Sequence, residues 1–231
     1  MLTNAAVCTH YLFGVAPGLM SEPSAIAICE QVTFDHARLG VQMTGLRVRH
    51  LERFDPDGGY PGMARRTAEM VRDPKIKRAE QDGAPTVLLD VTATGRVVAD
   101  LFADEGLDFT RVQISNAKRD NVTDEENPVI SRTELVSAIQ SLMQTKVLQV
   151  AAGLEIAETM EDQLQEFRMR DPQMSKTDPE QWAEMAGKDL VFAVGMCCWH
   201  AAHNLPVPKS QRSREDRLMR QHMKEVDQWV V

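Results

Sequence analysis

The stretch that decides the fold of this chain is Pro85-Thr86-Val87-Leu88-Leu89-Asp90-Val91-Thr92-Ala93-Thr94-Gly95. Residues 86–89 are apolar or β-branched, in a run too short for a helix and typical of a buried strand. Asp90 follows at the end of that strand, and after a small-residue turn the apolar residues of 97–102 have helical spacing. Because open α/β sheets carry their chemistry at strand ends, Asp90 is a candidate metal ligand. The alternative is an aspartate that caps the following turn.

The composition is that of an ordinary globular protein. The residues are 43% hydrophobic and 26% charged. A length of 231 residues is enough for one large domain or for one domain with extensions. The net charge of -8 argues against binding nucleic acid by bulk charge alone, although it suits carboxylates gathered around metal ions. The four cysteines match no zinc spacing, so we expect reduced thiols in a cytoplasmic setting. No apolar run or leader pattern indicates a membrane span or secretion.

Three strands are expected before the organising stretch, at 11–15, 24–32 and 44–54, after a loose lead-in over residues 1–10. Strands this close in sequence, without helices between them, favour antiparallel pairing. In the third, alternation places Leu46, Val48 and His50 on one face and Arg47, Arg49 and Leu51 on the other.

The remaining elements are expected on both sides of the organising stretch. Helical patterns occur at 61–80, where Asp73-Pro74 offers a break, and at 154–168 and 184–203, and short strands at 110–115 and 146–150. Ser131-Arg132-Thr133-Glu134 is a capping box and predicts a helix start. The polar segments 116–128 and 169–183 are expected to be mobile surface loops.

A change of composition after residue 205 predicts two parts, a domain over 1–205 and a tail over 206–231. Pro206-Val207-Pro208 blocks continuation of a helix. From Ser213 onward, an N-cap and a narrow stripe of Leu218, Val226 and Trp229 predict a C-terminal helix. That stripe needs a surface, either on the chain's own domain or on a partner.

The order of three strands, a helix, then strand, helix and strand resembles the ribonuclease H-like fold. Several motifs narrow the resemblance to the nuclease domain of tailed-phage terminase large subunits. Residues 13–18 followed by 24–28 resemble its first-strand motif, and residues 90–95 resemble its Asp-Ala-Thr-Gly-x-Gly segment. The helix start at 131–137 and the segment 187–193, with Trp199 later, resemble two further motifs. The resemblance implies an α/β fold with a mixed central sheet flanked by helices.

The resemblance implies a DNA endonuclease of a phage or prophage packaging system, acting in the cytoplasm of a bacterial host. Such nucleases hydrolyse phosphodiesters with two divalent ions, Mg2+ or Mn2+, held by carboxylates. The implied partners are double-stranded DNA and packaging components such as an ATPase motor and a portal. No phosphate-binding ATPase motif occurs in this chain.

Carried over by motif, the metal-ligand positions are the tip of the first strand, Asp90 and Asp189. The first of these positions is Ala16 here, where the family has a carboxylate that both ions share. The last motif also departs from the family's pattern, because Lys188 precedes Asp189. The ammonium group of Lys188 would then occupy the place of a metal ion. Glu22 in the following loop and Arg132 at the predicted helix start are further candidate site residues. We therefore expect weak or no metal binding and little nuclease activity.

Three explanations for Ala16 stay open at this point. The domain is a degenerate nuclease kept for binding, the alanine is an introduced inactivating change, or Glu22 replaces the lost ligand. A non-catalytic DNA- or protein-binding assembly module on the same fold is the alternative function, and a junction-resolving nuclease is a third. His200 and His203, and Cys197 and Cys198, are expected to be structural. A basic helix face over residues 65–78 either contacts DNA or is simply solvated.

Overall fold

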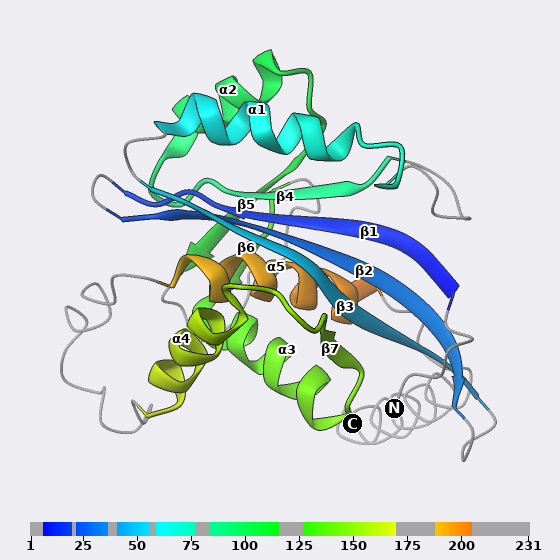
Figure 1. Cartoon of the computed structure of the whole chain (residues 1–231). Helices are drawn as coiled ribbons and strands as arrows, with labels where there is room; N and C mark the ends of the chain where they lie inside the picture. Colours follow the sequence, from blue (N-terminus) through cyan, green and yellow to red (C-terminus); the bar gives the residue numbers. More distant parts are fainter. Residues whose placement is uncertain are drawn as a thin grey trace, which may run out of the picture.

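A computed structural model describes residues 7–19, 22–36, 41–55, 59–76, 84–115, 127–169 and 188–204 of the chain. These residues form a seven-stranded sheet and five helices (Figure 1). In chain order the elements are β1 (Val7–Ala16), β2 (Ser24–His36), β3 (Val41–Phe54), α1 (Gly59–Val71), β4 (Thr86–Asp90), α2 (Gly95–Asp104), β5 (Thr110–Ser115), β6 (Val129–Ser131), α3 (Arg132–Gln144), β7 (Leu148–Val150), α4 (Ala157–Met169) and α5 (Asp189–Asn204). The predicted tail over 206–231 lies outside the described residues, as do 116–126 and 170–183 of the predicted loops and residues 184–187 of the helix expected at 184–203.

The strand order across the sheet is β6-β5-β4-β1-β2-β3-β7. Only β2 runs against its neighbours, being antiparallel to β1 and β3, whereas the other pairs are parallel. A reversed second strand between β1 and β3, with β4 and β5 added parallel to β1, is the arrangement of ribonuclease H-like folds. The predicted fold class, a mixed sheet flanked by helices, is confirmed.

Alternating side chains of the central strands divide the core into two layers. On one face Phe13, Val15 and Leu89 pack with α1 and α2, and on the other Leu12, Ala16 and Leu88 pack with α3 and α5. Figure 1 shows α1 and α2 above the sheet and α3, α4 and α5 below it. Since successive residues of a strand point to opposite faces, Asp90 shares its face with Leu88, on the side of α5.

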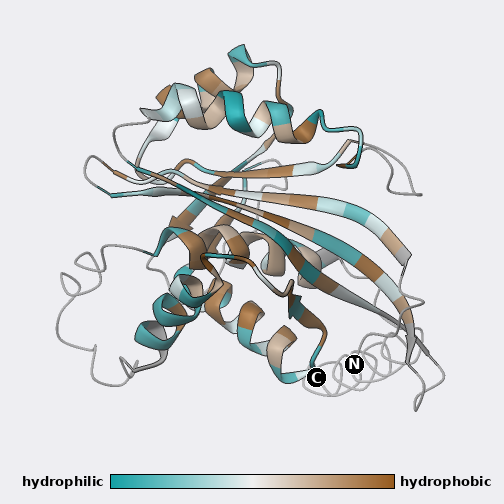
Figure 2. Cartoon of the chain, in the orientation of Figure 1, coloured by the Kyte–Doolittle hydropathy of each residue, from teal (hydrophilic) through white to brown (hydrophobic). Residues whose placement is uncertain are grey.

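Helix α5 lies between the sheet and α3. It contacts β1 at Gly14, whose backbone approaches the carbonyl of Ala193, and it meets Leu135 and Ile139 of α3 at Gly195. Most of its residues from Leu190 to Ala201 are buried, so it is apolar on nearly all sides. Helix α4 lies further out and is mainly hydrophilic in Figure 2. No helix of the described ranges has the length and apolarity needed to span a membrane.

The organising stretch and the capping box have the predicted structures. Residues 86–90 form a strand with a buried centre, and α2 begins at Gly95 with the positive φ of 57° that a glycine tolerates. At the start of α3 the Ser131 hydroxyl accepts a hydrogen bond from the Glu134 amide at 3.1 Å. This is the N-cap contact that the sequence predicts.

Removing this cap should destabilise the protein measurably. Ser131→Ala leaves an orphan amide at the buried start of α3, and we expect the free energy of unfolding to fall by about 1 kcal/mol. Urea denaturation followed by circular dichroism measures the change. Because Ser137 is an exposed residue of the same helix, Ser137→Ala serves as the control and should not destabilise. Equal losses in both variants would contradict a capping role.

Several boundaries differ from the sequence-based expectations. Strand β1 starts at Val7, within the expected lead-in, because it pairs with the far end of a longer β2. Helix α1 ends at Val71 rather than continuing to residue 80, since Asp73-Pro74 interrupts it. The three-residue β6, at the end of the expected loop 116–128, was not predicted because it is too short for a pattern. Strand β7 and helix α4 begin two and three residues later than expected.

A β-bulge in β3 changes which side chains face α5. The register with β2 shifts between the pairs Ile28–His50 and Cys29–Val48, so Arg49 is an extra residue. Leu51 therefore joins the same buried cluster as Leu46 and Val48, and the expected placement of Leu51 on the opposite face from them is wrong. Arg53, two residues beyond Leu51, follows it onto the α5 side of the sheet.

Candidate functional site

Positions 16, 90 and 189 meet at one edge of the sheet and on one face. Strands β1, β3 and β4 run in the same direction, so Ala16, Asp90 and the end of β3 lie at the same edge. Val15 pairs with Leu89, and continuing that register by one residue places Ala16 beside Asp90. Asp189, the first residue of α5, reaches this edge through its contact with Arg53. The edge is the candidate site that the sequence indicates.

Asp90 closes the turn after β4. One of its oxygens, Oδ1, accepts hydrogen bonds from the Thr92 amide at 2.8 Å and the Thr92 hydroxyl at 2.5 Å. That hydroxyl in turn accepts from the Ile114 amide of β5. Burial raises the pKa of the Asp90 carboxyl, opposed by the Thr92 hydrogen bonds and by the charge of Arg132. The turn-capping role is thus present, and it occupies an oxygen that a metal would use.

Asp189 is held by three hydrogen bonds at the start of α5. Arg53 donates from Nε to Oδ2 at 2.8 Å and from Nη2 to Oδ1 at 2.9 Å, which is a bidentate ion pair. Gln163 of α4 donates to Oδ1 at 3.0 Å and accepts from the Val191 amide at 3.3 Å. The Asp189 side chain is only 5% exposed, so these contacts largely replace solvent. The carboxylate joins β3, α4 and α5.

Glu22 reaches the same edge. A tight turn, in which the Glu22 amide donates to the Leu19 carbonyl at 2.7 Å, folds the loop after β1 back on itself. The loop is fixed to its surroundings, since Tyr60 donates to the Gly18 carbonyl at 2.7 Å and the Gly18 amide donates to Ser24 at 3.0 Å. Glu22 also lines a pocket of about 140 Å3 in this region.

Arg132, the first residue of α3, is subject to the charges of two of these acidic groups. Burial lowers its pKa, and the negative charges of Asp90 and Glu22 oppose that shift. Its guanidinium lies 5.7 Å from the ring centroid of Phe192 on α5. Arg132 therefore interacts with β4, the loop after β1 and α5 at once.

Lys188 precedes α5 and is buried, at 5% exposure. Its carbonyl accepts the first hydrogen bond of the helix, from the Phe192 amide at 2.9 Å. Three cationic residues, Arg53, Arg132 and Lys188, thus belong to an edge where the resemblance implies only acidic ligands. Of these, Arg53 was not identified from the sequence, because the bulge in β3 moves it to this face.

The residues present do not fit a pair of divalent ions. A two-metal site needs several carboxylate oxygens open to the ions, at roughly 2.1 Å for Mg2+. Here Ala16 offers no oxygen, both oxygens of Asp189 accept hydrogen bonds, and one oxygen of Asp90 caps a turn. Within the described ranges, no three His, Cys, Asp or Glu side chains come together in a way that would hold a metal.

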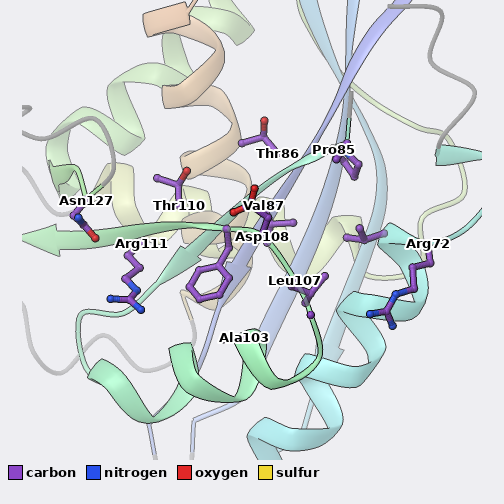
Figure 3. A pocket seen from close by; sticks show the side chains of 14 residues that line it. Arg72, Pro85, Thr86, Val87, Ala103, Leu107, Asp108, Thr110, Arg111 and Asn127 are labelled. Carbon is purple, nitrogen blue, oxygen red and sulfur yellow. The ribbon is translucent and has the colours of Figure 1, made fainter. Parts of the chain in front are cut away.

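A larger hollow lies away from this edge. It has a volume of about 1090 Å3 and is lined by Thr86 and Thr110, at the opposite ends of β4 and β5 from Asp90. Figure 3 shows Arg72 and Arg111 on its two sides and Asp108 between them. The hollow shares none of the site residues that the sequence indicates.

The other residues considered from the sequence have structural surroundings. Cys197 and Cys198 are free thiols in the core, and burial raises their pKa well above the ordinary value. His203 hydrogen-bonds to the Trp199 carbonyl at 2.9 Å, and its ring stacks near the Trp199 ring at 4.5 Å. These groups do not reach the sheet edge that carries Asp90.

Of the basic face expected over residues 65–78, Arg65 and Arg66 have acidic partners, and residues 77 and 78 lie outside the described residues. Arg66 pairs with Glu52 at 3.1 Å and with Glu69 at 3.4 Å, and Arg65 lies 3.9 Å from Glu105. Arg72 donates to the Glu105 backbone carbonyl. Paired arginines are poorer phosphate ligands, so this face gives little support to DNA contact.

The fold and site together define a ribonuclease H-like α/β domain in which Asp189, at the candidate edge, is paired with an arginine of the chain. No known family model matches the sequence, and no curated protein is similar to it. Among solved structures, the chain is similar to the large terminase from a thermophilic bacteriophage, in its third crystal form. The TM-score is 0.43 at 9% sequence identity, and the match covers 71% of this chain and 33% of that chain. This similarity is distant, and the fold assignment stands on the strand order.

Proposed function

We propose that this chain is a terminase-like nuclease domain of a phage or prophage DNA-packaging system, with a disabled two-metal site. One observation carries the proposal. Ala16 and Asp90 lie side by side at the carboxyl ends of parallel strands, on the face that α5 covers, and Asp189 at the start of α5 pairs with Arg53 at the end of β3. The position that both ions would share is an alanine, Ala16, buried at 3% exposure.

The proposal predicts that the chain as written neither binds divalent ions nor cleaves DNA. Millimolar Mg2+ or Mn2+ should leave the unfolding temperature unchanged within about 1 °C, because a ligand stabilises only a native state that binds it. Supercoiled plasmid should stay intact with either ion, since no residue at position 16 bridges the ions. Thermal unfolding and agarose gels measure these two results.

The control is Asp90→Ala, which removes the remaining strand-tip carboxylate. Any nicking that Asp90→Ala leaves unchanged comes from a contaminant. Robust cleavage by the unmodified chain that disappears in Asp90→Ala would show that the site is active, and the disabled-site proposal would then be wrong.

A second candidate function is a non-catalytic DNA- or protein-binding module on the same fold. The bidentate pair of Arg53 with Asp189 favours it, because a carboxylate committed to an internal arginine serves structure rather than metal binding. Fluorescence anisotropy with a duplex oligonucleotide at low and moderate salt separates the two kinds of module. Binding that weakens with salt indicates a DNA-binding module. The absence of binding at low salt indicates a protein-binding module, whose partner is a packaging protein such as a motor or portal component.

A further inference from the structure

The acidic residues at the candidate edge are matched by cations of the chain itself. Asp189 accepts two hydrogen bonds from Arg53, and Arg132, placed at the start of α3 with its guanidinium 5.7 Å from the Phe192 ring centroid, is subject to the charges of Asp90 and Glu22. A site that has merely lost one ligand would keep an excess of negative charge facing the place of the ions. This edge has gained positive charge as well as losing a carboxylate.

The pair of Arg53 and Asp189 has bidentate geometry. Two parallel hydrogen bonds of 2.8 and 2.9 Å use both carboxylate oxygens, and Gln163 adds a third donor at 3.0 Å. Each donor occupies a direction from which an ion would approach. A metal ion therefore competes with a planar, always charged guanidinium for the same oxygens.

The sheet provides the space that Arg53 needs. Across the strands, Arg53 pairs with Ala25, and Ala25 pairs with Ala16, so two methyl side chains separate it from β4. All three positions face α5, because Ala16, Ala25 and Leu51 belong to the same buried cluster. Because positions 16 and 25 carry only methyl side chains, they leave space above the sheet. The long Arg53 side chain and the first turn of α5 meet in that space.

Arg132 supplies a second positive charge on the other side of Ala16. It is the first residue of α3, and it interacts with Asp90 of β4 and with Glu22 from the loop that follows β1. Its contact with the Phe192 ring ties the guanidinium to α5. In the strand order, Ala16 of β1 thus lies between Arg53, at the end of β3, and Arg132, which follows β6.

We infer that Arg53 and Arg132 stand in for the two divalent ions, so that this edge is a metal-free ion-pair network rather than a metal site lacking one ligand. The inference rests on the proposed function, which identifies positions 16, 90 and 189 with a two-metal site. It predicts that restoring the missing carboxylate by Ala16→Asp is insufficient for metal binding. The new side chain pairs with the arginines instead of recruiting ions.

Four proteins test this inference: the unmodified chain, A16D, R53Q/R132Q and A16D/R53Q/R132Q. Glutamine keeps much of the arginine length while removing its charge. The probe is Mn2+ alone, followed by electron paramagnetic resonance of the unbound ion and by thermal unfolding with and without about 1 mM Mn2+. A fifth protein, A16D/R66Q, is the matched control, because Arg66 forms its ion pair with Glu52 on the opposite face of the sheet.

The expected result is that Mn2+ raises the unfolding temperature of the triple variant by about 5 °C or more and binds it saturably. The unmodified chain, A16D and A16D/R66Q should show neither effect, and R53Q/R132Q should show a smaller one. Where a variant is unfolded without metal, its refolding is titrated with Mn2+ under the same conditions. Recovery of the fold on titration then supports the inference, and its absence opposes it.

Two outcomes overturn the inference, and they differ in what they say about the proposed function. If A16D binds Mn2+ as tightly as the triple variant, the arginines do not replace the ions, although the terminase-like assignment stands. If the folded triple variant binds no Mn2+, the arginines are not what excludes metal. The edge is then no two-metal site, and the proposed function fails with the inference.

Discussion

Gly14→Ala is expected to lower the free energy of unfolding by about 3 kcal/mol or more. A Cβ atom at this position would overlap the backbone carbonyl oxygen of Ala193 and lie 2.8 Å from its carbon and 3.1 Å from the Cys197 sulfur. The obstacle is helix backbone, which cannot rotate away as a side chain does. Overpacking of a core typically costs about 1 to 3 kcal/mol, and a clash between a central strand and a buried helix belongs at the upper end.

Urea denaturation at neutral pH measures this effect, with Gly62→Ala as the matched control. A Cβ at Gly62 meets nothing within 4 Å, and the position is helical, so that variant should be stabilised by about 0.5 to 1 kcal/mol. Because α5 begins with Asp189, forcing it away from β1 should also disturb the pair with Arg53. A Gly14→Ala protein as stable as the unmodified chain would show that α5 does not lie against β1 as described.

The sequence predicts those elements whose signals are local. The run from Thr86 to Leu89 needs only its own composition to indicate a strand, and the Ser131 capping box needs only four residues to fix the start of α3. Their positions then follow from the order of elements. Asp90 and Asp189 share an edge because the parallel strands and the last helix of this fold converge there.

What the sequence does not predict depends on contacts between distant residues. The bulge at Arg49 is visible only in the pairing of β2 with β3, and it alone decides that Arg53 faces α5 rather than α1. The importance of Gly14 is likewise invisible, because it comes from the approach of a helix near the other end of the chain. A ligand set read from motifs therefore identifies the carboxylates but not the cations that hold them.

Glu22 is the reverse case, because the sequence argues against a position at the site that the structure nevertheless provides. The sequence makes its return to the site look costly, since a loop residue six positions after Ala16 must fold back. The turn at Leu19 and the hydrogen bonds of Gly18 provide that return, and Glu22 interacts with Arg132. The charge of Glu22 acts on an arginine, so its return to this edge balances a cation of the chain.

The second large effect is expected at the other end of α5, where acid should destabilise the protein through His200. The imidazole is partly buried beside His10 of β1 and His203 of α5, and burial followed by these two charges lowers its pKa to about 4. His10, whose ring hydrogen-bonds to the Thr86 hydroxyl at 2.8 Å, also has a pKa lowered by burial. Two histidines, His10 and His200, thus resist protonation where α5 meets β1 and β4.

The sign of the pH effect follows from proton binding. An unfolded chain protonates His200 near its ordinary pKa of about 6.5, whereas the folded protein does so only near 4. Between these values the unfolded state binds more protons, so stability falls as the pH is lowered from about 6.5 to about 4. The full difference corresponds to at most about 3 kcal/mol, and none of it is lost above about pH 7.

His200→Gln should remove this part of the acid sensitivity, because glutamine is polar and does not titrate. Free energies of unfolding are measured by urea denaturation of both proteins at about pH 7.5, 6.0 and 5.0. Carboxylates titrate alike in the two proteins, so the difference between the two pH profiles isolates His200. The variant is expected to lose about 2 kcal/mol less than the unmodified chain between about pH 7.5 and 5.0. Parallel profiles over this range would mean that His200 is protonated as easily in the folded protein as in the unfolded chain, which is incompatible with its position between β1 and the end of α5.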